Sequence, residues 1–162
     1  MRLFLIRHAQ AGDRTDGVRD VLRPLAPKGH RRAEELAALL ADQGVTRVLS
    51  SPATRCLQTV APLARAMGLD VEEQAALWEG SPVDHVLSLF ETMSGPAGAR
   101  LTAVKPVVAA CSHGDIIPEV VDSLHRSGVP ITGRGCEKGS IWVLDHNGRR
   151  WVSAVYMPRS QG

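Results

Sequence analysis

Two arginines and two histidines follow strand-like segments of this 162-residue chain. The apolar run LFLI precedes Arg7 and His8, and the run PVVAAC precedes His113. A third run, residues 46–50, ends about one helical turn before Arg55. The carboxyl ends of parallel strands meet at one edge of a sheet, which is where ligands bind. We therefore expect these four side chains to converge on one site.

These residue types suit phosphoryl transfer. A phosphoryl group carries its charge on three oxygens, and its transfer is catalysed mainly by positioning and electrostatic stabilisation. The planar guanidinium groups of Arg7 and Arg55 match those oxygens. A neutral imidazole can attack phosphorus and hold the group as a covalent intermediate. Gly114, directly after His113, would permit close approach of the backbone to the ligand.

Strand-like and helical segments alternate along the chain, which is typical of a layered α/β domain. Strands are expected at 2–7, 46–50, 106–111, 140–144 and 151–156, with a weaker one at 69–73. Helices are expected at 28–43, 52–67, 82–93 and 115–127, with Ser51 and Asp115 as N-caps, a kink at Pro62, and Gly95 and Gly128 at two of the helix ends. Asn147–Gly148 suits a hairpin turn, so the last two strands should be antiparallel.

Composition narrows the function classes. Hydrophobic content of 44% and charged content of 22% fit one globular domain, residues 1–162. A net charge of +2 with 4% aromatic residues does not favour a nucleic-acid partner. No apolar run approaches the ~20 residues of a membrane span, and only four apolar residues follow Met1–Arg2, which argues against a signal peptide. The three cysteines are an odd number at unrelated spacings, which favours a protein of the reducing cytoplasm. None of them begins a Cys-x5-Arg phosphatase loop.

The blocks RHA, SSPATRCLQT and SHGD together resemble the signature of the histidine phosphatase superfamily, which includes the phosphoglycerate mutases. The resemblance implies a phosphoglycerate mutase-like, three-layer α/β/α sandwich with a mostly parallel sheet and an antiparallel edge strand. It implies that His8 is the phosphorylated nucleophile and that Arg7, Arg55 and His113 form the phosphate pocket. Glu79 in ALWEG matches the position of the family's acid/base carboxylate and would donate the proton; an exposed loop glutamate is the alternative.

Two further segments narrow the resemblance. RDVLRPLAPKGHRRAEELAALL resembles a segment of short bacterial phosphohistidine phosphatases, which implies that Arg23 reaches the pocket; a surface role is the alternative. CSHGDIIPEVVDSLHRSG and CEKGSIWVL are similar to the C-terminal phosphatase domain of actinobacterial Nudix hydrolases, although this chain contains no Nudix box. The irregular segment 12–26 is long for a compact domain, so it is either part of the site or a solvated face.

We expect a metal-independent phosphohydrolase without a cofactor, because the carboxylates do not cluster as Mg²⁺ or dimetal sites require. Its substrate would be a phosphorylated small molecule, a nucleotide or a phosphoprotein, and the chain a monomer or homodimer. Only about 25 residues separate Glu79 from the strand at 106, which favours an open site and a hydrolase rather than a mutase. The alternatives are a metallophosphatase using His8, Asp13, His113 and Asp115, and a phosphate- or phosphoprotein-binding module without turnover.

Overall fold

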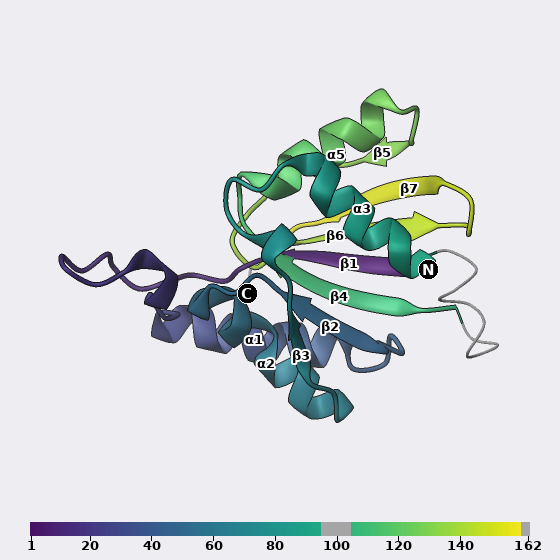
Figure 1. Cartoon of the computed structure of the whole chain (residues 1–162). Coiled ribbons are helices and arrows are strands. Elements are labelled where there is room, and N and C mark those ends of the chain that lie inside the picture. Colours follow the sequence, from purple (N-terminus) through teal and green to yellow (C-terminus); the bar gives the residue numbers. More distant parts are fainter. Residues whose placement is uncertain (95–104, 160–162) are drawn as a thin grey trace.

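A seven-stranded sheet runs through the middle of the protein in the order β3-β2-β4-β1-β6-β7-β5 (Figure 1). The computed structural model describes residues 1–94 and 105–159. Within these residues the strands are β1 (Arg2–Arg7), β2 (Arg47–Ser50), β3 (Val71–Glu73), β4 (Val107–Ser112), β5 (Ile131–Thr132), β6 (Ile141–His146) and β7 (Trp151–Met157). All of them except β6 run in the same direction. The predicted, mostly parallel sheet is confirmed.

The antiparallel strand lies inside the sheet, so its predicted position at the edge was wrong. β6 pairs with β1 on one side and with β7 on the other. The predicted antiparallel pairing of the last two strands is confirmed, with Asn147–Gly148 in the turn between them. The two-residue strand β5 was not predicted. It pairs in parallel with the outer side of β7 and so forms the edge.

Two pairs of helices cover the two faces of the sheet (Figure 1). α1 (Pro27–Leu40) and α2 (Thr54–Met67) lie on one face, and α3 (Val83–Ser94) and α5 (Ile116–Arg126) lie on the other. Two short 3-10 turns, η1 (Asp20–Leu22) and η2 (Ala75–Leu77), precede α1 and α3. The expected three-layer α/β/α architecture is therefore observed. In the described part of the chain, no helix combines the length and apolarity needed to span a bilayer.

β1 is fixed from both sides, because successive side chains of a strand point to opposite faces. Leu3 and Leu5 belong to the core cluster beneath α3 and α5, whereas Phe4 and Ile6 belong to the cluster beneath α1 and α2. All four are almost fully buried. Burying each side chain stabilises the fold by about 1.5–3 kcal/mol. The continuous apolar run therefore makes β1 a rigid support for the residue pair that follows it.

Helix ends follow the sequence signals only in part. α2 continues through Pro62 and ends at Met67. Gly68 caps it in the left-handed conformation, with a φ of 66°. Its N-cap is Ala53, so the prediction of Ser51 as the cap was wrong. α5 ends at Arg126, close to the predicted Gly128, while the predicted end at Gly95 lies outside the described residues.

The first turn of α1 packs directly on the chain that leaves β1, which requires a glycine. The amide of Ala26 donates a 2.9 Å hydrogen bond to the carbonyl of Gln10. A Cβ added at Gly29 would lie 2.1 Å from that carbonyl oxygen. No rotamer change can relieve a contact between a Cβ and the backbone, so α1 itself would have to move.

We predict that Gly29→Ala destabilises the protein by about 1–3 kcal/mol, because the steric cost exceeds the gain of about 0.5–1 kcal/mol from replacing a helical glycine. The melting temperature should fall by roughly 2–4 °C per kcal/mol in a domain of this size. Gly12→Ala is the matched control, since its Cβ would meet only the Pro24 carbonyl oxygen at 3.7 Å. Equal melting temperatures for the two variants would contradict the prediction.

Candidate active site

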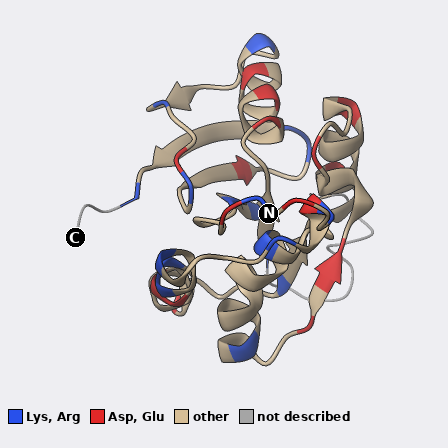
Figure 2. Cartoon of the chain, turned by 90° about the vertical axis from the view of Figure 1, so that its left-hand side faces the viewer, with Lys and Arg blue, Asp and Glu red and all other residues tan. Residues whose placement is uncertain are grey.

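The four residues expected to converge do lie together, at the edge of the sheet where β1, β2 and β4 end. Arg7 pairs in register with Ser112, the residue before His113. The rings of His8 and His113 are 5.5 Å apart, and Arg55 Nη2 lies 3.4 Å from His113 Nδ1. Figure 2 looks onto this edge and shows basic and acidic residues side by side around it. The parallel topology therefore brings three distant sequence blocks together.

The His8 ring is held in a form suited to nucleophilic attack. Nδ1 lies 2.8 Å from the carbonyl oxygen of Ala9, which can only accept a hydrogen bond, so Nδ1 carries the proton and Nε2 the lone pair. The residue is only 6% exposed. Burial lowers the pKa of His8 to about 4, and the nearby charges of Arg55, His113 and Arg7 act in the same direction, against the Ala9 hydrogen bond. The imidazole is thus neutral near pH 7.

Arg7 lies across the backbone of the loop after β4. Its Nη1 donates a hydrogen bond to the carbonyl of Cys136. A Cβ at Gly114 would come within 2.7 Å of Arg7 Nε and Cζ, so the glycine makes room for this guanidinium group. The close approach that the sequence suggested at Gly114 is thus made by Arg7, within the protein. Arg7 Nε is buried and has no hydrogen-bond partner in the described part of the chain.

Arg55 is fully buried and is paired with two carboxylates. Nη1 donates to the carbonyl oxygen of Asp20 at 3.0 Å and lies 3.3 Å from its Oδ2, and Nη2 lies 2.9 Å from Glu79 Oε1. Such pairing offsets the cost of burying a charge. Its Nε, like that of Arg7, is buried without a partner among residues 1–94 and 105–159. Two unpartnered guanidinium N–H groups beside a neutral imidazole are what an oxyanion would satisfy.

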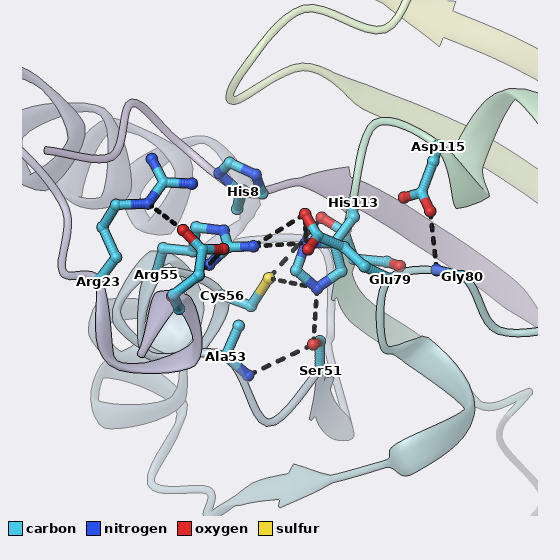
Figure 3. A network of polar contacts seen from close by, with 12 residues as sticks. His8, Arg23, Ser51, Ala53, Arg55, Cys56, Glu79, Gly80, His113 and Asp115 are labelled. Carbon is cyan, nitrogen blue, oxygen red and sulfur yellow. Dashed lines mark hydrogen bonds and ion pairs between the residues drawn. The ribbon is translucent and has the colours of Figure 1, made fainter. Parts of the chain in front are cut away.

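His113 and Glu79 form the other half of the network in Figure 3. His113 Nε2 lies 2.7 Å from Ser51 Oγ, and Nδ1 lies 3.3 Å from Glu79 Oε1. The Glu79 side chain is 41% exposed, but its carboxylate reaches Arg55 and His113 from the loop that follows η2. The structure therefore places a half-exposed carboxylate at the mouth of the cluster, where it can exchange protons with solvent.

Arg23 pairs with Asp20, the second carboxylate beside Arg55. Its Nε donates to Asp20 Oδ1 at 2.8 Å, and its Nη1 donates to the Gly12 carbonyl at 3.1 Å. Burial acts to raise the pKa of Asp20, but the Arg23 hydrogen bond and the Arg55 charge outweigh it and lower the pKa. Asp20 thus joins segment 12–26 to Arg55. Arg23 forms its hydrogen bonds to Asp20 and Gly12, within the same segment.

Asp115 was predicted to cap α5, and this was wrong. It occupies the N-cap position, but its side chain makes no capping hydrogen bond. Instead, Asp115 Oδ2 accepts a 2.8 Å hydrogen bond from the amide of Gly80. Among residues 1–94 and 105–159, no three His, Cys, Asp or Glu side chains lie together as a metal site.

Several contributors to the cluster could not be singled out from the sequence. Cys56 Sγ lies 3.6 Å from His113 Nε2 at the back of the site. Gly139 donates from its amide to the carbonyls of both Arg7 and His8, at 3.0 and 3.2 Å. The glycine-rich run GRGCEKG, between the expected helix 115–127 and the expected strand 140–144, was the available signal for this second loop.

We predict that the His8 ring titrates near pH 4, well below the ordinary histidine value of about 6.5. Between those two pH values the unfolded chain binds a proton that the folded protein does not, so stability should fall as the pH drops through this window. NMR of ring-labelled protein, with His8→Ala to assign the resonance, measures the titration. A midpoint of 6 or above would show that the ring is not held in its neutral form.

The chain is similar to known phosphatases in sequence. Residues 3–84 match the model of the histidine phosphatase superfamily (branch 1). The chain is 30% identical over 161 residues to an 8-oxo-(d)GTP phosphatase of Mycolicibacterium smegmatis, covering 96% of this chain and 47% of that protein, so it spans about half of that relative's length. It is 26% identical over 140 residues to a phosphohistidine phosphatase SixA homolog of Haemophilus influenzae, covering 82% of each.

Solved structures share the fold. The protein histidine phosphatase SixA complexed with tungstate superimposes with a TM-score of 0.74 at 21% identity, covering 97% of this chain and 94% of that one. A mycobacterial glucosyl-3-phosphoglycerate phosphatase superimposes with a TM-score of 0.66 at 18% identity, covering 96% of each. The family match and the named relatives support phosphatase activity. With RHA, SSPATRCLQT and SHGD meeting at one sheet edge, the chain belongs to the histidine phosphatase superfamily.

Proposed function

We propose that this protein is a phosphohydrolase that carries the phosphoryl group on Nε2 of His8. The observation that carries the proposal is the fixed, neutral His8 ring beside two guanidinium groups with unpartnered Nε atoms. Nε2 attacks phosphorus while the bond to the leaving oxygen breaks and its electron pair stays on that oxygen. Water then attacks the phosphohistidine, which releases inorganic phosphate and regenerates the imidazole.

Arg7, Arg55 and His113 stabilise the transferring oxygens in this mechanism. Each fixed charge at ~4 Å contributes about 4 kcal/mol at an effective dielectric constant near 20, before desolvation is subtracted. The unpartnered Nε atoms offer the phosphoryl oxygens donors in addition to those that Arg55 uses in its ion pairs. Because the two arginines supply the positive charge, the mechanism needs no metal ion.

Glu79 donates the proton to the leaving oxygen and then accepts one from the attacking water. In the first step the protonated carboxyl group lies beside the leaving oxygen, so that its proton can pass to that oxygen as the bond to phosphorus breaks. The exposed side of Glu79 allows the proton to come from solvent. The same carboxyl can therefore serve as acid in the first step and as base in the second.

The substrate class that fits is a phosphoryl group on a bulky carrier, either a nucleotide or a protein histidine. The half-exposed Glu79 leaves space beyond the reacting group, and the names of the two curated relatives include one carrier of each kind. We infer a cytoplasmic hydrolase, consistent with three free cysteines, two of them buried. Turnover of a nucleotide panel and of a phosphohistidine protein, each with and without excess chelator, decides between the carriers and tests metal independence.

We predict that brief exposure to radiolabelled substrate leaves an acid-labile, base-stable label on the protein, as expected for phosphohistidine. His8→Ala should abolish both the label and turnover, since the other imidazole of the site, His113, has its Nε2 2.7 Å from Ser51 Oγ. His85→Ala, an exposed histidine of α3, is the control and should retain both. Label that persists on His8→Ala would assign the nucleophile to another residue.

Lysine should replace neither arginine, because it lacks the planar fork. We predict that Arg7→Lys and Arg55→Lys each lower kcat/KM by about 10-fold or more, equivalent to ~1.4 kcal/mol of transition-state stabilisation. Arg65→Lys on the same helix is the matched control, because Arg65 forms an exposed ion pair with Glu34. Unchanged kinetics for Arg55→Lys would place its guanidinium group outside the phosphate pocket.

A further inference from the structure

The loop that carries Glu79 is anchored on both sides by the SHGD segment. Ser112 Oγ donates a 2.8 Å hydrogen bond to the carbonyl of Leu77, two residues before Glu79. Asp115 Oδ2 accepts the 2.8 Å hydrogen bond from the amide of Gly80, the residue directly after it (Figure 3). We propose that Asp115 is a positioning residue for Glu79, which holds the proton donor in place while the substrate reacts.

Glu79 needs such an anchor because its side-chain contacts are made to groups that also serve the phosphate. Its Oε1 contacts Arg55 and His113, and both are assigned to the transferring oxygens. When a phosphoryl group draws on those two residues, their hold on the carboxyl group weakens. The hydrogen bond from Gly80 to Asp115 involves neither of them, so it persists throughout the reaction.

The local geometry favours a positioning role for Asp115 over a purely structural one. The Asp115 side chain does not cap α5, and no Lys, Arg or His of the described residues lies within 4 Å of its carboxylate. Gly80 has a φ of 73°, a left-handed conformation that turns the chain directly after Glu79 and aims its amide at Asp115. The contact is exposed, so its loss should cost little stability.

The inference rests on the proposed role of Glu79 as the proton donor. A general acid must lie within about 2.6–3.2 Å of the atom it protonates, and misplacement by about 1 Å can cost ~100-fold in rate. An alkyl phosphate needs that proton, because an alkoxide is a poor leaving group. A nitrophenyl phosphate depends on it much less. Loss of the anchor should therefore slow only substrates with poor leaving groups.

The test measures kcat and KM of Asp115→Ala and Glu79→Gln on an alkyl phosphate and on nitrophenyl phosphate. We expect Asp115→Ala to lower kcat on the alkyl phosphate by about 10- to 100-fold, with KM and the aryl reaction little changed. Asp115→Asn should restore most of the rate, because the amide oxygen still accepts the Gly80 hydrogen bond. In the double variant, Asp115→Ala should add little to Glu79→Gln, since both act on one proton transfer.

Asn147→Ala is the control, because Asn147 Oδ1 likewise accepts backbone hydrogen bonds from Arg149 and Arg150, in the turn between β6 and β7. It should leave the ratio of alkyl to aryl rates unchanged, and circular dichroism checks folding. If Glu79→Gln is selective for the alkyl phosphate and Asp115→Ala is not, the inference about Asp115 is wrong and the proposed function stands. If Glu79→Gln is itself unselective, the proton-donor role is wrong and this inference fails with it.

Discussion

The burial of one positive charge organises the site. Arg55 has no exposed surface, and a guanidinium group in the interior costs several kcal/mol unless anionic partners surround it. Asp20 and Glu79 supply them, one from the segment after β1 and the other from the loop after η2. The ion pairs that offset the cost of burying the Arg55 charge therefore also place both loops at the mouth of the site. The phosphoryl group of the proposed mechanism adds a third anion beside Arg55, and Arg7 brings a second positive charge to the same edge of the sheet.

Rigid strands and helix starts then set the remaining geometry. β1 is packed on both faces, so Arg7 and His8 leave the sheet at a fixed place. Each member of SHGD makes a different contact. Ser112 and Asp115 form hydrogen bonds to the backbone of Leu77 and Gly80. His113 contacts the carboxylate of Glu79, and Gly114 leaves space for the Arg7 guanidinium group. Four consecutive residues thus join the end of strand β4 to the end of β1 and to the loop after η2.

Patterns that depend on one element alone could be predicted from the sequence. The apolar runs and the alternation of strands with helices were sufficient for the three layers, and the strand-end rule was sufficient to bring Arg7, His8, Arg55 and His113 together. Ser51 and Asp115 were assigned to helix caps from local preference, but His113 and Gly80 compete for those side chains in the folded protein. β5 has only two residues and no periodicity, so its pairing depends on β7 being already in place.

The position of β1 in the sheet has a consequence for how the chain folds. β1 comprises residues 2–7, yet its two neighbours in the sheet are residues 107–112 and 141–146. Loop-closure entropy must be overcome for both pairings before any stability is gained, so high contact order should make folding slow. On the ribosome, β1 cannot pair with β4 until residues 107–112 have emerged, and its second pairing must wait for residues 141–146. The central strand of the sheet is thus an unpaired apolar segment while the roughly one hundred residues between it and β4 are synthesised, which makes it a natural site for chaperone binding.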